Sequence, residues 1–141
     1  MPRSRRKSVA GMRAVDTNVL VRLLVDDDAA QADVARQAMA LEPVFVPKTV
    51  VLELTWVLRS AYGMAPAAIA AGVEGLLSAE GISVEDATAV RRAVAWFREG
   101  LDFADALHLA SSGHVDSLVT FDVAMRRRAS AIGTDPPVVS P

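Results

Sequence analysis

Four acidic residues lie inside or directly after apolar segments, where a carboxylate is unfavourable unless it serves a purpose. Asp16 lies in "AVDTNVLV", Glu53 in "VVLELTWVL", Asp105 in "FADALHLA" and Asp122 in "LVTFD". These surroundings predict positions at the edge of the core rather than on a freely solvated face. Like charges gathered there raise one another's pKa and oppose folding, so a cluster of them requires a compensating cation.

A divalent metal ion is a better compensating cation than a side chain, because the flanking residues supply few lysines or arginines. The chain has no cysteine, and its two histidines, His108 and His114, lack a spaced partner for a metal pair or a catalytic triad. We expect both histidines to be structural or exposed. Ligands that are all oxygen atoms favour one or two Mg²⁺ or Mn²⁺ ions over Zn²⁺.

Three of the acids also have ordinary structural interpretations. Asp105 alone could be a first-turn acid that faces a helix dipole, and Asp122 alone could be a turn or N-cap residue. Glu53 alone could be a buried acid paired with Arg59 or Lys48. Considered together, the four positions favour a shared site.

Small polar residues accompany the acids. Thr17, Asn18 and Thr120 suit positions that orient carboxylates or a bound water, and their alternative role is local hydrogen bonding to the backbone at strand ends. The triplet Asp26–Asp28 is a competing acidic cluster. It has the pattern of a solvated helix start, with Asp28 as N-cap.

Short β-branched segments alternate with longer segments of helical period, which predicts an α/β domain with a parallel sheet covered by helices. In such an open sheet the carboxyl ends of the strands lie on one side, so the four acids can converge there. Asp102 is the expected N-cap of the helix that carries Asp105. We expect strands at residues 13–18, 43–47, 82–84, 116–122 and 136–141, and helices at residues 19–25, 26–41, 48–63, 65–81, 85–100, 101–114 and 123–130.

The 141 residues, 52% of them hydrophobic, correspond to one globular domain. We assign the domain to residues 12–141 and a disordered basic extension to residues 1–11. The extension holds four of the 15 basic residues, which leaves 11 basic against 17 acidic residues in the domain. An acidic body of this kind meets nucleic acid only through a local basic patch. No apolar segment approaches a membrane span and no cysteine is present, so we expect a cytoplasmic protein without a membrane partner.

The four motifs resemble those of the PIN domain, and specifically of VapC-type ribonuclease toxins from type II toxin–antitoxin pairs. "VDTNVLVRLL", "VLELTWVLR", "DFADALHLA" and "LVTFD" occur in the family's order and at its usual spacing, over about residues 12–135. "DTN" alone is a weak signal, whereas four ordered motifs that carry all four acids are specific. The basic segment before Met12 departs from the family pattern.

The resemblance implies a central parallel sheet of four or five strands with helices on both faces, and a metal-dependent endoribonuclease that cuts structured RNA. It also implies a homodimer that a cognate antitoxin inhibits. The apolar helix at residues 66–79 is consistent with a surface covered by such a partner. The acidic quartet of the family matches Asp16, Glu53, Asp105 and Asp122, and its supporting polar positions match Thr17, Asn18 and Thr120. Asp102 matches a position where the family is less consistent, and it is left outside the quartet.

Hydrolysis by an activated water would leave a 5′-phosphate and a 3′-hydroxyl, since it does not use the neighbouring 2′-hydroxyl. The acidic site itself repels RNA, so cations on its rim must hold the phosphates. The candidates are Arg22, Lys48, Arg59, Arg126, Arg127 and Arg128, although the last three also fit a solvated helix face.

Three other functions compete with this interpretation. A phosphorylated receiver domain needs a lysine on a late strand, and no lysine follows Lys48. A haloacid-dehalogenase-type phosphatase needs a second acid two residues after its nucleophilic aspartate, where this chain has Asn18. A non-catalytic PIN scaffold that binds RNA or protein is the remaining alternative, and the intact quartet argues against it.

Overall fold

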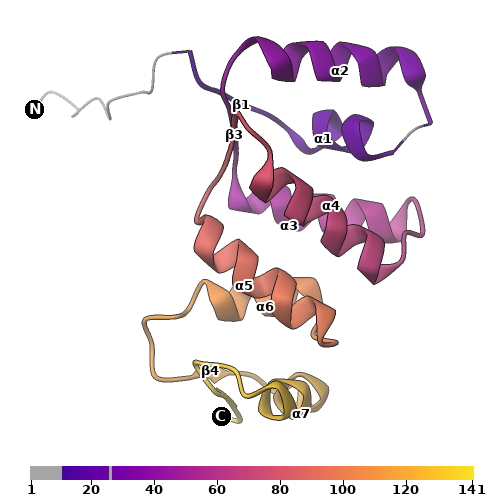
Figure 1. The fold of residues 1–141 in the computed structure, drawn as a ribbon. Coiled ribbons are helices and arrows are strands. Elements are labelled where there is room, and N and C mark those ends of the chain that lie inside the picture. The colour runs from indigo at the N-terminus through magenta and orange to yellow at the C-terminus, as the bar shows by residue number, and fades with distance from the viewer. Residues whose placement is uncertain (1–10, 26) are drawn as a thin grey trace, which may run out of the picture.

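The structure is a computed structural model that describes residues 11–25 and 27–141. The basic extension expected at residues 1–11 therefore lies outside the described residues, except for Gly11. Short strands and helices alternate along the chain, as the sequence predicts (Figure 1). The elements are β1 (Arg13–Ala14), α1 (Thr17–Leu24), α2 (Ala29–Leu41), β2 (Val44–Val46), α3 (Lys48–Ser60), α4 (Pro66–Ser78), β3 (Ile82–Val84), α5 (Ala87–Arg98), α6 (Phe103–Ala110), β4 (Leu118–Val119), α7 (Val123–Ile132) and β5 (Val138–Val139).

The expectation of one sheet with four or five strands is wrong. Strands β1, β2 and β3 form a parallel three-stranded sheet in that order, and β4 and β5 form a separate parallel pair. Figure 1 shows β4 and α7 at the opposite end of the molecule from α2. The pattern of apolar residues predicts that a segment is a strand, but it does not say which strand lies beside it.

Backbone hydrogen bonds account for the separate pair. The N–H of Leu118 donates to the carbonyl of Pro137 at 2.9 Å, and the N–H of Thr120 donates to Val139 at 3.0 Å. Strands of two residues have few such groups, so these bonds to the C-terminal segment determine the neighbour of β4. The three-stranded sheet is also covered unequally, because Val44 and Val46 are buried on one face of β2 whereas Phe45 is half-buried.

The first strand is shorter than expected. The sequence predicts a strand over residues 13–18, but Thr17 and Asn18 begin α1. Asp16 is the N-cap of this helix, and its side chain accepts a hydrogen bond from the N–H of Thr17 at 2.8 Å. Asp16 therefore starts a helix, and it does not end a longer strand.

The hydrophobic core lies among the helices and the buried face of β2. Helix α5 packs against α4 and α6, and α3 packs against α1, α4 and α6. In α4, the large side chains Ile69, Val73 and Leu76 are buried within this core. The apolar helix at residues 66–79 is therefore explained by packing within the chain, and it does not by itself indicate a covering partner. Within the described residues, no helix combines the length and apolarity needed to cross a membrane.

Candidate functional site

Three aspartates near the predicted site are N-caps, and this role fixes where their carboxylates lie. Asp16 caps α1, Asp102 caps α6 and Asp122 caps α7. One oxygen of Asp102 accepts from the N–H of Asp105 at 3.3 Å, and one oxygen of Asp122 accepts from the N–H of Met125 at 3.0 Å. An aspartate side chain has two oxygens, so capping leaves acceptor capacity for another partner.

Asp105 is the centre of the strongest electrostatic conflict in the site. Burial raises the pKa of its carboxyl group above the ordinary value, and the negative charges of Asp102 and Asp122 raise it further. His108 and Arg128 oppose this rise without cancelling it. The starts of α6 and α7 thus bring three carboxylates into mutual electrostatic range.

The other two predicted acids come from elements other than α6 and α7. Asp16 lines a shallow hollow beside β1 with Val44, and Glu53 projects from α3. Asp16, Glu53 and Asp122 are exposed, while Asp105 is half-buried. The expectation that all four acids lie at the edge of the core is therefore correct for Asp105 and wrong for the other three, because N-capping and helix position turn their side chains outward.

Glu53 is not a buried acid paired with Lys48 or Arg59, which was its alternative structural role. Lys48 pairs with Asp86 at 3.2 Å, and Arg59 lies 3.7 Å from Asp102. Within the described part of the chain Glu53 forms no ion pair with either cation. Its carboxylate is therefore available to another ligand.

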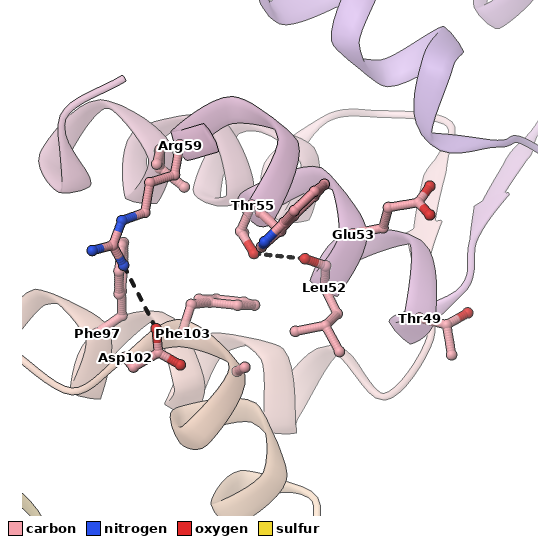
Figure 2. Close-up of a pocket in the computed structure, with 11 residues that line it drawn as sticks. Thr49, Leu52, Glu53, Thr55, Arg59, Phe97, Asp102 and Phe103 are labelled. Atoms are coloured by element: carbon pink, nitrogen blue, oxygen red, sulfur yellow. Dashed lines mark hydrogen bonds and ion pairs between the residues drawn. The ribbon is translucent and has the colours of Figure 1, made fainter. Parts of the chain in front are cut away.

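A cavity of about 370 Å³ connects the α3 and α6 parts of the site. Glu53 lines one side of it, and Asp102 and Arg59 line the other (Figure 2). Phe97 and Phe103 form an apolar floor, with their rings edge to face at 5.6 Å between centroids. The arrangement places an apolar surface between charged groups of both signs.

The candidate phosphate-binding cations fall into two groups. Arg22 pairs with Asp27 at 2.7 Å, and Arg126 donates to the carbonyl of Thr120 at 2.8 Å, so both have partners within the chain. Arg127 and Arg128 are exposed, and neither forms an ion pair among the described residues. The positive charge of Arg128 lowers the pKa of Asp105, against the larger effects that raise it.

The three supporting polar residues differ from one another. Thr120 has its alternative role of local hydrogen bonding to the backbone. Its Oγ1 accepts a hydrogen bond from the N–H of Asp122 at 3.1 Å. Asn18 is exposed and lines a hollow against α2. Thr17 is buried, and its Oγ1 has no hydrogen-bond partner among the residues that the structure describes. Buried hydroxyl groups are rarely left unpaired, so this atom next to Asp16 is a candidate position for a ligand contact.

The remaining sequence predictions concern the histidines and the acidic triplet. His108 and His114 are exposed, as expected. Asp28 caps α2 by accepting from the N–H of Gln31 at 3.0 Å, while Asp26 lies outside the described residues. The described part of the triplet therefore has the structural role that was predicted for it.

A family model described as the PIN domain matches residues 13–131. The chain belongs to the PIN-domain family. No curated protein matches the sequence. The PIN domain is generally a nuclease fold, and its members typically depend on divalent metal ions.

The donor groups of this PIN domain fit a divalent ion in chemistry but do not form a complete binding group. Carboxylate oxygens are the ligands that Mg²⁺ and Mn²⁺ prefer, and a cation beside Asp105 would relieve the repulsion from Asp102 and Asp122. Among residues 11–25 and 27–141, however, no three acidic or histidine side chains are close enough together to bind one ion. The metal-binding role of the quartet therefore stays a prediction.

Asp102 was left outside the expected quartet, yet it contacts several parts of the site. It caps α6, raises the pKa of Asp105, lies near Arg59 and lines the cavity with Glu53. The sequence contained the signal for this, because an N-cap three residues before Asp105 must lie in the same helical turn. Its assignment as N-cap is confirmed, and its proximity to the acidic group follows from that role.

The pKa of Asp105 predicts a pH-dependent effect of the isosteric substitution Asp105→Asn. Because the folded-state pKa is raised above the usual 3.8, ionisation of Asp105 costs stability as the pH rises through the folded value. We expect the variant to be more stable than wild type at neutral pH, by less than about 1 kcal/mol because water screens the half-exposed carboxylate. The advantage should disappear in acid, where the wild-type carboxyl group is protonated.

Thermal unfolding from neutral to acidic pH measures this difference. The control is Asp33→Asn, which removes an exposed acid of α2 that pairs with Arg36 at 2.8 Å. The control should be no more stable than wild type at any pH. An Asp105→Asn protein that melts below wild type at neutral pH would show that this carboxylate is not under net repulsion.

Proposed function

We propose that this PIN domain is a metal-dependent endoribonuclease whose site is formed by Asp16, Glu53, Asp105 and Asp122. The observation that carries the proposal is the raised pKa of Asp105, which is half-buried and experiences the negative charges of Asp102 and Asp122 at the starts of α6 and α7. A folded protein retains such a conflict mainly where it serves a function. The unpaired carboxylate of Glu53 adds a further oxygen donor at the neighbouring cavity.

In this proposal the acidic residues bind the metal ion and the arginines bind the RNA. Asp105 and Asp122, together with Glu53 and Asp16, would hold one or two Mg²⁺ or Mn²⁺ ions. When bound, such an ion supplies a Lewis acid for the phosphate and makes water a usable nucleophile near neutral pH. Arg127 and Arg128, which are exposed, would attract the RNA backbone toward the acids, which repel it.

A non-catalytic PIN scaffold is the second candidate function. It is favoured by the lack of a complete ion-binding group among the described residues. A scaffold would bind RNA through the exposed arginines and would not need the carboxylates. The two functions therefore differ in the effect of removing one acid.

The first test of the proposed activity is RNA cleavage by the purified protein with Mg²⁺ or Mn²⁺. We expect cleavage to be abolished by EDTA and reduced by at least about 100-fold in Asp16→Asn, since a lost ligand weakens both ion binding and the orientation of the phosphate. The products should carry a 5′-phosphate and a 3′-hydroxyl. Gel analysis of a labelled RNA measures the rate and the product ends.

Asp33→Asn is the matched control, because it removes an exposed carboxylate of α2 outside the site. This variant should cleave at the wild-type rate. Undiminished cutting in chelator, or equal cutting by Asp16→Asn, would contradict the metal-dependent mechanism. RNA binding without cleavage by the wild type would support the scaffold.

Ion binding can also be measured without activity. Mg²⁺ that binds only the folded state raises the melting temperature by mass action. We expect wild type to gain stability with added Mg²⁺, by about 2.7 kcal/mol at 100 times the dissociation constant, and Asp122→Asn to gain much less. Thermal melts with and without Mg²⁺ measure both values, and an equal rise in the two proteins would show that Asp122 does not hold the ion.

We further propose that the protein is a VapC-type toxin inhibited by a cognate antitoxin, with a homodimer as its functional state. The resemblance of the four motifs supports this assignment. An exposed apolar patch made of Val119, Phe121 and Val123 flanks Asp122, and Phe121 is 85% exposed. An antitoxin that covers this patch would also block the acidic site.

Expression in a bacterial host tests the toxin assignment. We expect growth arrest with wild type and none with Asp16→Asn, because arrest requires RNA cleavage. Co-expression of a cognate antitoxin, sought as a small DNA-binding protein encoded beside the gene, should restore growth. Normal growth with an active, well-expressed enzyme would contradict the toxin role, and sedimentation of the purified protein tests the homodimer separately.

A further inference from the structure

Trp56 is the most unusual side chain in the cavity between α3 and α6. It is 68% exposed, although α3 buries Val51, Leu54 and Leu58 on its other side. The other tryptophan of the chain, Trp96, is half-buried against the core. Single exposed apolar residues are common on protein surfaces, but this indole borders a cavity with an apolar floor.

The spacing along α3 aligns three different chemical groups at this cavity. Glu53, Trp56 and Arg59 follow one another at intervals of three residues, so they lie on one side of the helix in successive turns. All three line the cavity. A carboxylate of the proposed catalytic site, an aromatic ring and a guanidinium are thus presented in a row.

The ion pair between Arg59 and Asp102 at the rim of the cavity is weak. Arg59 and Asp102 lie 3.7 Å apart, with side chains that are 70% and 43% exposed, so water screens their attraction. A ligand can separate them at little cost. Arginine binds phosphate oxygens well, and an aspartate can accept a hydrogen bond from the exocyclic amine of a base.

We propose that this cavity binds one unpaired nucleobase of the RNA substrate, stacked on Trp56. The adjoining phosphate pairs with Arg59, and Asp102 accepts from an exocyclic amine such as that of cytosine. This inference rests on the proposed nuclease function, since it places the bound nucleotide beside Glu53. It predicts that cleavage takes place where the RNA has an unpaired nucleotide.

A peptide is the competing occupant, and the cavity suits it less well. Helical peptides that bind in a groove insert several apolar anchors along its length. Here a single hollow of about 370 Å³ carries charges of both signs at its rim. Stacking on an exposed aromatic ring beside a cation is instead the usual way of holding single-stranded nucleic acid.

Binding is measured in EDTA, so that no cleavage is needed. The probes are a short single-stranded oligocytidylate and an abasic oligonucleotide of the same length. In a Trp96→Phe background Trp56 is the only tryptophan, and its fluorescence should be quenched saturably by the first probe and not by the second. Equal binding of the two probes would overturn the proposal, because it would mean that only the phosphates are recognised.

Substitutions of Trp56 separate stacking from apolar contact. Trp56→Leu keeps an apolar side chain but cannot stack, and we expect it to weaken oligocytidylate binding about tenfold. Trp56→Tyr keeps an aromatic face and should stay within about twofold of wild type. Leu41→Ala, which removes an exposed leucine of α2 outside the cavity, is the control and should bind as wild type does. Unchanged affinity in Trp56→Leu would overturn the proposal.

The outcomes distinguish this inference from the proposed function. Base-dependent binding without any metal-dependent cleavage would leave the base site intact and remove the nuclease assignment. Metal-dependent cleavage with wild-type affinity in Trp56→Leu would leave the nuclease intact and remove the base site. Absence of saturable quenching by oligocytidylate would exclude a base at Trp56 and would favour the peptide.

Discussion

Hydrogen bonds from helix-start N–H groups to aspartate side chains determine where the acidic groups of this protein lie. The backbone N–H groups in the first turn of a helix have no partner within the helix, and a carboxylate satisfies them well. Asp16, Asp102 and Asp122 each accept such a bond, at the starts of α1, α6 and α7. The same bonds that begin these helices therefore hold negative charge where it can meet a ligand.

The charges around these caps explain how the acidic group persists. Asp102 and Asp122 act on Asp105 from the two helix starts, and burial adds to their effect on its pKa. Arg128 reduces the conflict without forming an ion pair with Asp105 among the described residues. Lys48 is engaged by Asp86 at another part of the surface. PIN domains generally use divalent metal ions, and a cation beside Asp105 would lower the cost of its charge.

The division of the strands into two sheets has a direct effect on this site. Asp16 follows β1 of the three-stranded sheet, whereas Asp122 follows β4 of the separate pair. Among the described residues, no backbone ladder joins β1 to β4, so strand pairing does not fix the distance between Asp16 and Asp122. The group around Asp105 is local to α6 and α7, whereas Asp16 and Glu53 belong to the starts and turns of α1 and α3.

The sequence by itself determined the features that depend on neighbouring residues. The predicted N-caps Asp28 and Asp102 are confirmed, as are the strands near residues 43–47 and 82–84 and the helix that carries Glu53. These features could be predicted because N-caps, prolines and the period of apolar residues act over a few neighbouring residues. The four acids could likewise be selected from their apolar neighbours. Only the tertiary structure decided that β4 pairs with β5, that three of the four acids are exposed, and that Trp56 borders a cavity with Arg59 and Asp102. These features depend on contacts between segments distant in the chain, for which a local pattern carries no information.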